Sequence, residues 1–124
     1  MTRTRLALAA AAALLALTIV PLAAARAHPA ARAHPAKAQS VAVTMKEFKF
    51  TLSSSSVHPG TVTFRLKNAG HIVHDFRIAG KTSPMIQPGK TGALVVTLKK
   101  GSYPYLCTVP GHAAAGMKGV LRVA

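Results

Sequence analysis

The stretch VTFRLK at residues 62–67 alternates apolar and polar side chains. Its apolar residues Val62, Phe64 and Leu66 share one parity, and a Thr, an Arg and a Lys stand at the other positions. A period of two residues is typical of a β-strand with one buried face and one face toward water. The stretch therefore predicts a strand whose even-numbered side chains enter a core.

The same alternation recurs along the chain, and sequences typical of turns separate the runs. No long stretch has the helical period. Six to eight short strands in one small domain predict an antiparallel β-sandwich. The further runs lie at residues 48–52, 76–78 and 93–98, and the turns are HPG at 58–60, NAG at 68–70, PG at 88–89 and KKG at 99–101.

Length and composition limit what the chain does. It has 124 residues, one Cys, 16 Lys and Arg, and two Asp and Glu, which gives a formal net charge of +14. One domain typically takes about 100–200 residues, so a multi-domain enzyme is excluded. A single Cys excludes an internal disulfide framework and a metal cluster held by cysteines alone. Neither a Ser/His/Asp set nor paired catalytic carboxylates are evident, and we expect that the protein is not an enzyme.

Metal-ligating residue types gather in the C-terminal third, where Cys107, His112 and Met117 form the pattern C-x4-H-x4-M. Soft sulfur favours Cu(I), imidazole suits both oxidation states of copper, and two His, one Cys and a weak axial Met form the blue-copper arrangement. Zinc is bound by Cys, His and carboxylates rather than by Met. We therefore expect one copper ion per chain. Met85, in a long loop, is the alternative source of the thioether.

A blue-copper ligand set needs a second histidine, and residues 68–78 offer His71 and His74. His74 has the parity of Phe76 and Ile78, so its side chain is expected to point with theirs into the core. His71 is expected to lie in the preceding loop. The sequence thus favours His74 as the ligand and keeps His71 as the alternative.

The first 27 residues predict a secretory signal peptide. Two arginines precede an uncharged run rich in Ala and Leu, Pro21 ends the run, and Ala-x-Ala cleavage sites follow at 23–25 and 25–27. The alternative is an uncleaved membrane anchor, because residues 6–25 are uncharged and about 20 apolar residues span a bilayer. We expect an exported protein, periplasmic or extracellular.

Residues 28–39 predict an extended linker before a copper domain at 40–124. The hexapeptide ARAHPA at 25–30 is repeated at 31–36, and Ala and Pro without periodicity are typical of a tether. Two histidines in the repeat, His28 and His34, allow a second hypothesis. Cleavage that leaves RAH at the new N-terminus would present an amine, two amides and an imidazole to Cu(II) in a square plane. A duplicated spacer is the simpler interpretation.

The motifs at 68–76, 88–90 and 100–119 resemble those of the cupredoxins, the family of plastocyanin, pseudoazurin and azurin, and the resemblance covers roughly 40–124. The ligand spacing is similar to that of auracyanin and rusticyanin. The resemblance implies an all-β, Greek-key β-sandwich of seven to eight strands. It also implies a type 1 copper site and one-electron transfer. The ligands on this resemblance are His74, Cys107, His112 and Met117.

Asp75 departs from the family pattern, in which the residue after the first His ligand is often Asn. The resemblance implies that the backbone N–H of this residue donates to the Cys sulfur and that its side chain ties the two ligand loops together. We expect the carboxylate charge to lower the reduction potential.

A small exported electron carrier is the function that the sequence favours. The alternative is a periplasmic copper-binding, trafficking or copper-resistance protein, which the His-Pro tether would suit. A copper oxidase or nitrite reductase needs a further copper site, and the remaining histidines are too few for one.

The charge and the residues around His112 predict the partners. Small apolar residues at 110–115 predict an uncharged patch at which a redox protein docks through a small interface. Removal of residues 1–27 leaves 13 basic and two acidic residues, a net charge of +11 that would attract an acidic protein partner or an anionic membrane surface. No nucleic-acid motif is evident, so we expect no nucleic acid, and we expect a monomer.

Overall fold

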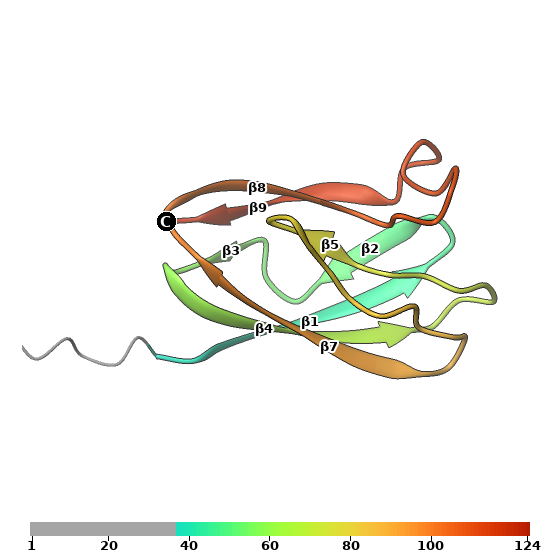
Figure 1. The fold of residues 1–124 in the computed structure, drawn as a ribbon, viewed down its shortest axis with the longest axis horizontal. Coiled ribbons are helices and arrows are strands. Elements are labelled where there is room, and N and C mark those ends of the chain that lie inside the picture. Colours follow the sequence, from blue (N-terminus) through green and yellow to red (C-terminus); the bar gives the residue numbers. More distant parts are fainter. Residues whose placement is uncertain (1–36) are drawn as a thin grey trace, which may run out of the picture. The chain divides into compact units, whose positions relative to one another are not determined.

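Nine strands form two facing sheets in the computed structural model, which describes residues 37–124 (Figure 1). One sheet has the strand order β2-β1-β4-β7, and the other has the order β3-β9-β8-β5-β6. The all-β sandwich expected from the sequence is confirmed. The first sheet contains β1 (Gln39–Lys46), β2 (Lys49–Leu52), β4 (Gly60–Asn68) and β7 (Thr91–Leu98); the second contains β3 (Ser56–Val57), β5 (Arg77–Ile78), β6 (Lys81–Thr82), β8 (Gly101–Leu106) and β9 (Lys118–Val123).

The core lies between the inner faces of the two sheets. In β4 the side chains of Val62, Phe64 and Leu66 are buried, as the alternation predicts. Phe64 packs against Phe76 with ring centroids 5.1 Å apart. Pairs of this kind contribute stability beyond the apolar area that they bury. The predicted parity thus selects the core residues of this strand.

Strand direction and strand number differ from the expectation. β1 pairs with β4 in parallel, and β3 pairs with β9 in parallel, so the antiparallel prediction is wrong for these two pairs. The reason is the path of the chain, which passes from β2 to β3 in the opposite sheet before it returns as β4 beside β1. The count rises to nine because three strands, β3, β5 and β6, are only two residues long.

Phe48 also departs from the predicted pattern. The sequence places it in a strand with Phe50, yet it lies in the turn between β1 and β2 and is 41% exposed. The register pairs Lys46 with Lys49, so residues 47 and 48 form a two-residue connection. The alternation of buried and exposed side chains therefore stops at the turn, and the Phe48 side chain lies outside the core.

One end of the sandwich collects the segments that carry the predicted ligands. The β4–β5 connection, which carries His74, and the β8–β9 connection, which carries the other three, both lie there beside the β1–β2 turn (Figure 1). Within each sheet the strand ends are paired, Met45 with Asn68 and Leu106 with Lys118, and the Thr108 N–H donates to Asp75 across the two connections. Within the described residues, no helix is long and apolar enough to cross a membrane. The predicted signal peptide and the linker histidines His28 and His34 fall outside the described residues.

Candidate metal centre

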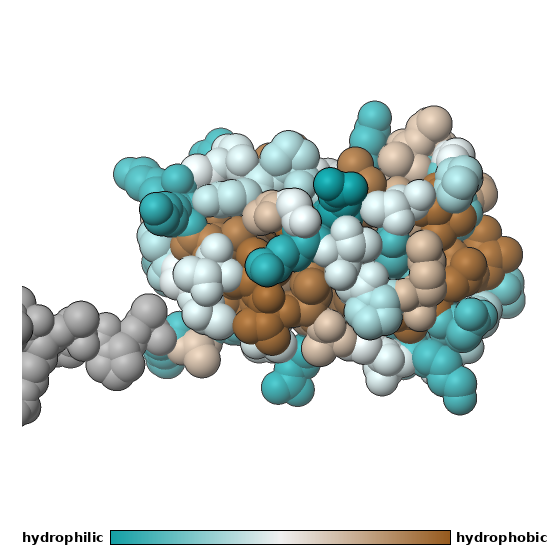
Figure 2. All heavy atoms as spheres, in the orientation of Figure 1, coloured by the Kyte–Doolittle hydropathy of each residue, from teal (hydrophilic) through white to brown (hydrophobic). Residues whose placement is uncertain are grey.

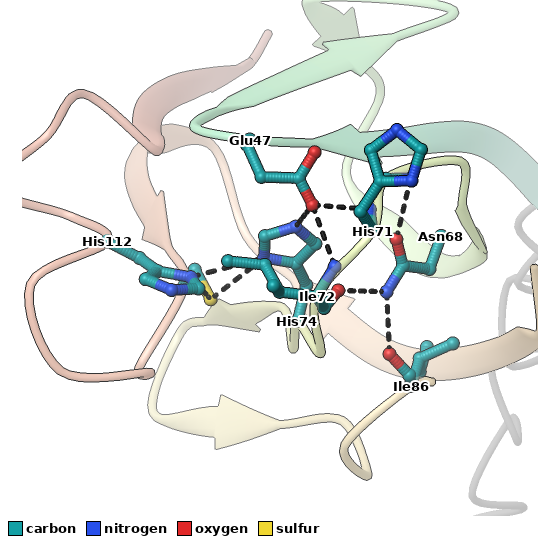
Figure 3. A network of polar contacts seen from close by, with 9 residues as sticks. Glu47, Asn68, His71, Ile72, His74, Ile86 and His112 are labelled. Carbon is teal, nitrogen blue, oxygen red and sulfur yellow. Dashed lines mark hydrogen bonds and ion pairs between the residues drawn. The ribbon is translucent and has the colours of Figure 1, made fainter. Parts of the chain in front are cut away.

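Three ligand atoms converge at this end of the sandwich. His74 Nδ1 lies 3.2 Å from His112 Nδ1, and Cys107 Sγ lies 3.5 Å from His112 Nδ1 and 4.0 Å from His74 Nδ1 (Figure 3). All three residues are buried, and His112 retains the largest exposure, 7%. Residues 33 positions apart in the sequence thus present their donor atoms to one point.

The triangle of donor atoms has the size that a metal ion needs. Three coplanar bonds of about 2.0–2.3 Å to nitrogen and sulfur place the donors about 3.5–3.8 Å apart. The observed edges of 3.2, 3.5 and 4.0 Å lie around that range. A thiolate with two imidazoles is also the equatorial donor set of a blue-copper site, so the residues fit copper in chemistry as well as in spacing.

Met117 directly precedes β9 and is hydrogen-bonded through its backbone to two of these three residues. Its side chain is fully buried, its carbonyl accepts the N–H of Cys107 at 3.1 Å, and its own N–H donates to the carbonyl of His112 at 3.0 Å. The two alternative ligands are placed differently. Met85 is 54% exposed, and His71 is exposed as well. The structure therefore brings the donor atoms of His74, Cys107 and His112 together, buries Met117 next to them in the chain, and leaves the two alternatives at the surface.

The loop of residues 107–117 has a compact form that its glycines permit. Gly111 has φ +83° and Gly116 has φ +113°, backbone conformations that favour glycine. Between them the N–H of His112 donates to Val109 O, and the N–H of Ala115 donates to Gly111 O. These turns fix the position of His112 relative to Cys107.

Asp75 joins the two segments that carry the donor atoms. Its carboxylate accepts the N–H of Thr108 at 2.6 Å and also the hydroxyl of Thr108. Thr108 follows Cys107 and Asp75 follows His74, so one side chain ties the two ligands together. This is the role that the resemblance implies for the position, performed here by a buried carboxylate.

Burial sets the protonation of the donor groups. It raises the pKa of the Cys107 thiol above its ordinary value, although backbone N–H groups of Asp75 and Val109 act in the opposite direction. It lowers the pKa of His74, which favours the neutral imidazole that binds metals. The buried thiol is therefore protonated near neutral pH until a metal ion replaces the proton.

The sequence did not predict that the Glu47 carboxylate contacts the loop before His74. Its Oε1 accepts the N–H groups of His71 at 2.6 Å and Ile72 at 2.9 Å, and lies 3.4 Å from His74 Nε2 (Figure 3). The backbone N–H of Ile72 leads the interactions that lower the pKa of Glu47 to about 2. Strand parity carries no signal for this contact, because both partners lie in turns.

Asn68 holds the other side of the same loop. Its Nδ2 donates to the carbonyls of Ile72 and Ile86, each at 2.8 Å, and its Oδ1 accepts the N–H of Gly70 at 2.9 Å. Asn68 is buried at the end of β4. The segment before His74 is thus fixed by two side chains, Asn68 from one side and Glu47 from the other.

Apolar side chains border the centre at the surface. The ring of Phe48 lies edge-on to the ring of His112, with centroids 5.0 Å apart and an interplanar angle of 72°. Ile72, Pro110 and Ala114 are also exposed. Figure 2 shows apolar residues reaching the surface at the end of the molecule that carries these loops.

Solved structures with a similar fold include auracyanins and an azurin. The structure is similar to a dithionite-reduced auracyanin from Roseiflexus castenholzii, with a TM-score of 0.58, 24% identity, and coverage of 73% of this chain and 99% of that one. Auracyanin A from Chloroflexus aurantiacus, described as a blue copper protein, gives a TM-score of 0.59 at 22% identity and covers 70% of this chain and 99% of its own. An azurin from Methylomonas sp. strain J gives 0.57 at 18% identity, covering 69% of this chain and 98% of that one.

Sequence comparisons point to the same family. Auracyanin-B from Chloroflexus aurantiacus is 48% identical over 40 residues, which are 32% of this chain and only 17% of that protein. The model of the cupredoxin-like domain matches residues 9–123. Because that match spans most of the chain and the structure has the expected sandwich, the chain belongs to the family of cupredoxin-like domains.

Proposed function

We propose that the protein is a small exported type 1 copper protein that carries one electron at a time between redox partners. The observation that supports this most directly is the convergence of His74 Nδ1, Cys107 Sγ and His112 Nδ1 within 4.8 Å of one another. Met117 would supply a thioether donor, and the set would hold one copper ion per chain. When bound, copper supplies the one-electron couple.

The protein's contribution is to keep the donors where both oxidation states accept them. Cys107 and Met117 are linked through the backbone, and Asp75 links the Cys107 segment to the His74 segment. Burial excludes water from the donors, and small geometric change between states makes electron exchange fast. The closed, buried centre also favours electron transfer over substrate turnover, so we infer that the protein is not an enzyme.

The surface around His112 is the proposed site of electron exit. His112 is the most exposed of the donors, and the Phe48 ring beside it is apolar and exposed. An apolar patch on a strongly basic molecule suits a brief encounter with an acidic redox protein, or attachment to an anionic membrane surface. We propose that the protein acts as a monomer outside the cytoplasm, with no nucleic acid partner.

The visible spectrum of the full chain loaded with Cu(II) tests this function. An intense thiolate-to-copper absorption is expected, and Cys107→Ser should abolish it. Two matched pairs of variants extend the test. His74→Ala should remove the absorption, and His71→Ala should keep it. Met117→Leu should alter the spectrum, and Met85→Leu should leave it unchanged. A colourless wild-type product would contradict the proposal.

Release of copper to a chelator distinguishes the carrier from the copper-trafficking alternative. A buried site whose loops are joined by hydrogen bonds should lose copper slowly compared with the time of one electron transfer. Rapid and complete transfer of Cu(I) to a competing thiol ligand, with no stable coloured Cu(II) form, would favour trafficking instead.

A further inference from the structure

The only two carboxylate side chains of the chain both lie at the metal centre. The sequence contains two Asp and Glu against 16 Lys and Arg. Asp75 binds the residue after Cys107, and Glu47 reaches the residues around His74 from the β1–β2 turn. In a chain so poor in acidic residues, this placement makes Glu47 the group that most needs an explanation.

Glu47 makes one oxygen serve three neighbours. Oε1 accepts the N–H groups of His71 and Ile72 at 2.6 and 2.9 Å, and the same atom faces His74 Nε2 at 3.4 Å (Figure 3). Within the described residues, Nε2 is fully buried and has no hydrogen-bond partner. A modest shortening of the 3.4 Å contact would give a charge-assisted hydrogen bond, for which about 2.7–2.9 Å is usual.

The Glu47 carboxylate occupies the space that a side chain at Gly70 would take. A Cβ atom at residue 70 would lie 2.7 Å from Glu47 Oε2 and nearer still to Oε1. The backbone of Gly70 is outside the left-handed region that requires glycine. A side chain at residue 70 would therefore displace the Glu47 carboxylate from its present position, an observation independent of the hydrogen bonds.

We propose that Glu47 is a positioning residue for the copper site: it holds His74 with Nε2–H toward the carboxylate and Nδ1 toward the metal, and its negative charge favours Cu(II) over Cu(I). This inference rests on the proposed function. A carboxylate behind a metal-bound imidazole fixes the tautomer and raises the basicity of the ligand. Stronger donation and a nearby negative charge both stabilise the more highly charged ion.

Glu47→Gln tests the charge while it keeps the acceptor oxygen. The reduction potential of the copper-loaded full chain should rise, because the Cu(II)/Cu(I) equilibrium should shift toward Cu(I) by about tenfold, or about 59 mV for a one-electron couple. The matched control is Ala38→Lys, which makes the same change in net charge just before the start of β1, far from the centre. Ala38→Lys should leave the potential unchanged. A Glu47→Gln protein with the wild-type spectrum and the wild-type potential would overturn the proposal.

The tautomer of His74 gives a second test that needs no copper. In metal-free wild-type protein, nitrogen-15 NMR at neutral pH should show the proton of His74 on Nε2. Glu47→Gln should retain this tautomer, and Glu47→Ala should lose its fixed orientation. A wild-type proton on Nδ1 would overturn the proposal even if the variants fail to fold. Failure of the proposed function would appear separately, as the absence of thiolate-to-copper absorption in the wild type.

Discussion

At the residue scale, Cys107 is the donor whose chemistry depends most on its surroundings. Its thiol is buried at the end of β8, and burial raises its pKa. His74 differs, because burial lowers its pKa and keeps the imidazole neutral. In the proposed copper site the two donors would therefore have different proton requirements: the thiol must lose a proton, and the imidazole has none to lose.

Copper binding near pH 7 should release about one proton per chain. Because the folded pKa of Cys107 is raised, the thiol is protonated at this pH, and the apparent affinity should rise about tenfold per pH unit until that pKa is passed. Calorimetric titration of Cu(I) in buffers of different ionisation enthalpy measures the proton count. Cys107→Ser is the control that should release none, and a wild-type value near zero would contradict the prediction.

The residues at the centre differ in how far the sequence reveals them. Parity selects His74 over His71. Spacing from Cys107 selects His112 and Met117, of which Met117 directly precedes β9 and His112 lies within the β8–β9 connection. Glu47 escapes the same test. It sits in a turn, and its partners belong to another turn that only the three-dimensional fold brings near. Parity describes faces of strands and says nothing of contacts between loops.

At the scale of elements, β4 is the strand on which the sandwich depends. It lies between β1 and β7 in its sheet, and its inward side chains are buried along its whole length. The alternation that the sequence shows there predicts the core well, because a central strand has one continuous inner face. Sequence alternation does not specify which strand is the neighbour or whether the neighbour runs parallel, so the parallel β1–β4 pair was not predicted.

Phe64→Ala should lower the free energy of unfolding by about 3–5 kcal/mol, because it opens a cavity at a fully buried position. Phe48→Ala is the matched control: the same side chain is removed from an exposed turn, and the loss should be below about 1 kcal/mol. Denaturant unfolding of the metal-free chain measures both. Equal losses for the two variants would contradict the assignment of core and surface.

At the scale of the whole molecule, charge is distributed very unevenly. Acidic side chains are confined to the centre, at Glu47 and Asp75, while basic residues occupy outward positions such as Arg65 and Lys67 on β4. The folded protein therefore presents a mostly positive surface, with apolar side chains such as Phe48 and Ile72 exposed near His112. Composition alone predicts that the electrostatic potential is positive. The fold shows where on the surface the apolar residues lie.

Electron exchange with small redox reagents should show this field. An anionic metal complex should react faster than a cationic complex of similar driving force, and its rate should fall as salt is added, since screening acts over about 10 Å at 0.1 M ionic strength. Stopped-flow measurement over a range of ionic strength gives both rates. The cationic complex should show the opposite salt dependence, and rates that are independent of salt for both reagents would contradict the prediction.

The register between β8 and β9 has a consequence for how such a site changes over evolutionary time. Leu106 and Lys118 face each other across the ladder, so the chain leaves and re-enters the sheet at paired positions. An insertion or deletion between Leu106 and Lys118 leaves the alignment of the two strands unchanged. Cys107, His112 and Met117 all lie between Leu106 and Lys118. Their spacing can therefore vary while the sheets and His74, which belongs to another connection, keep their positions. The two sheets can therefore stay the same while the β8–β9 loop changes in length, so evolution can alter the spacing of these donors by changing a single short loop.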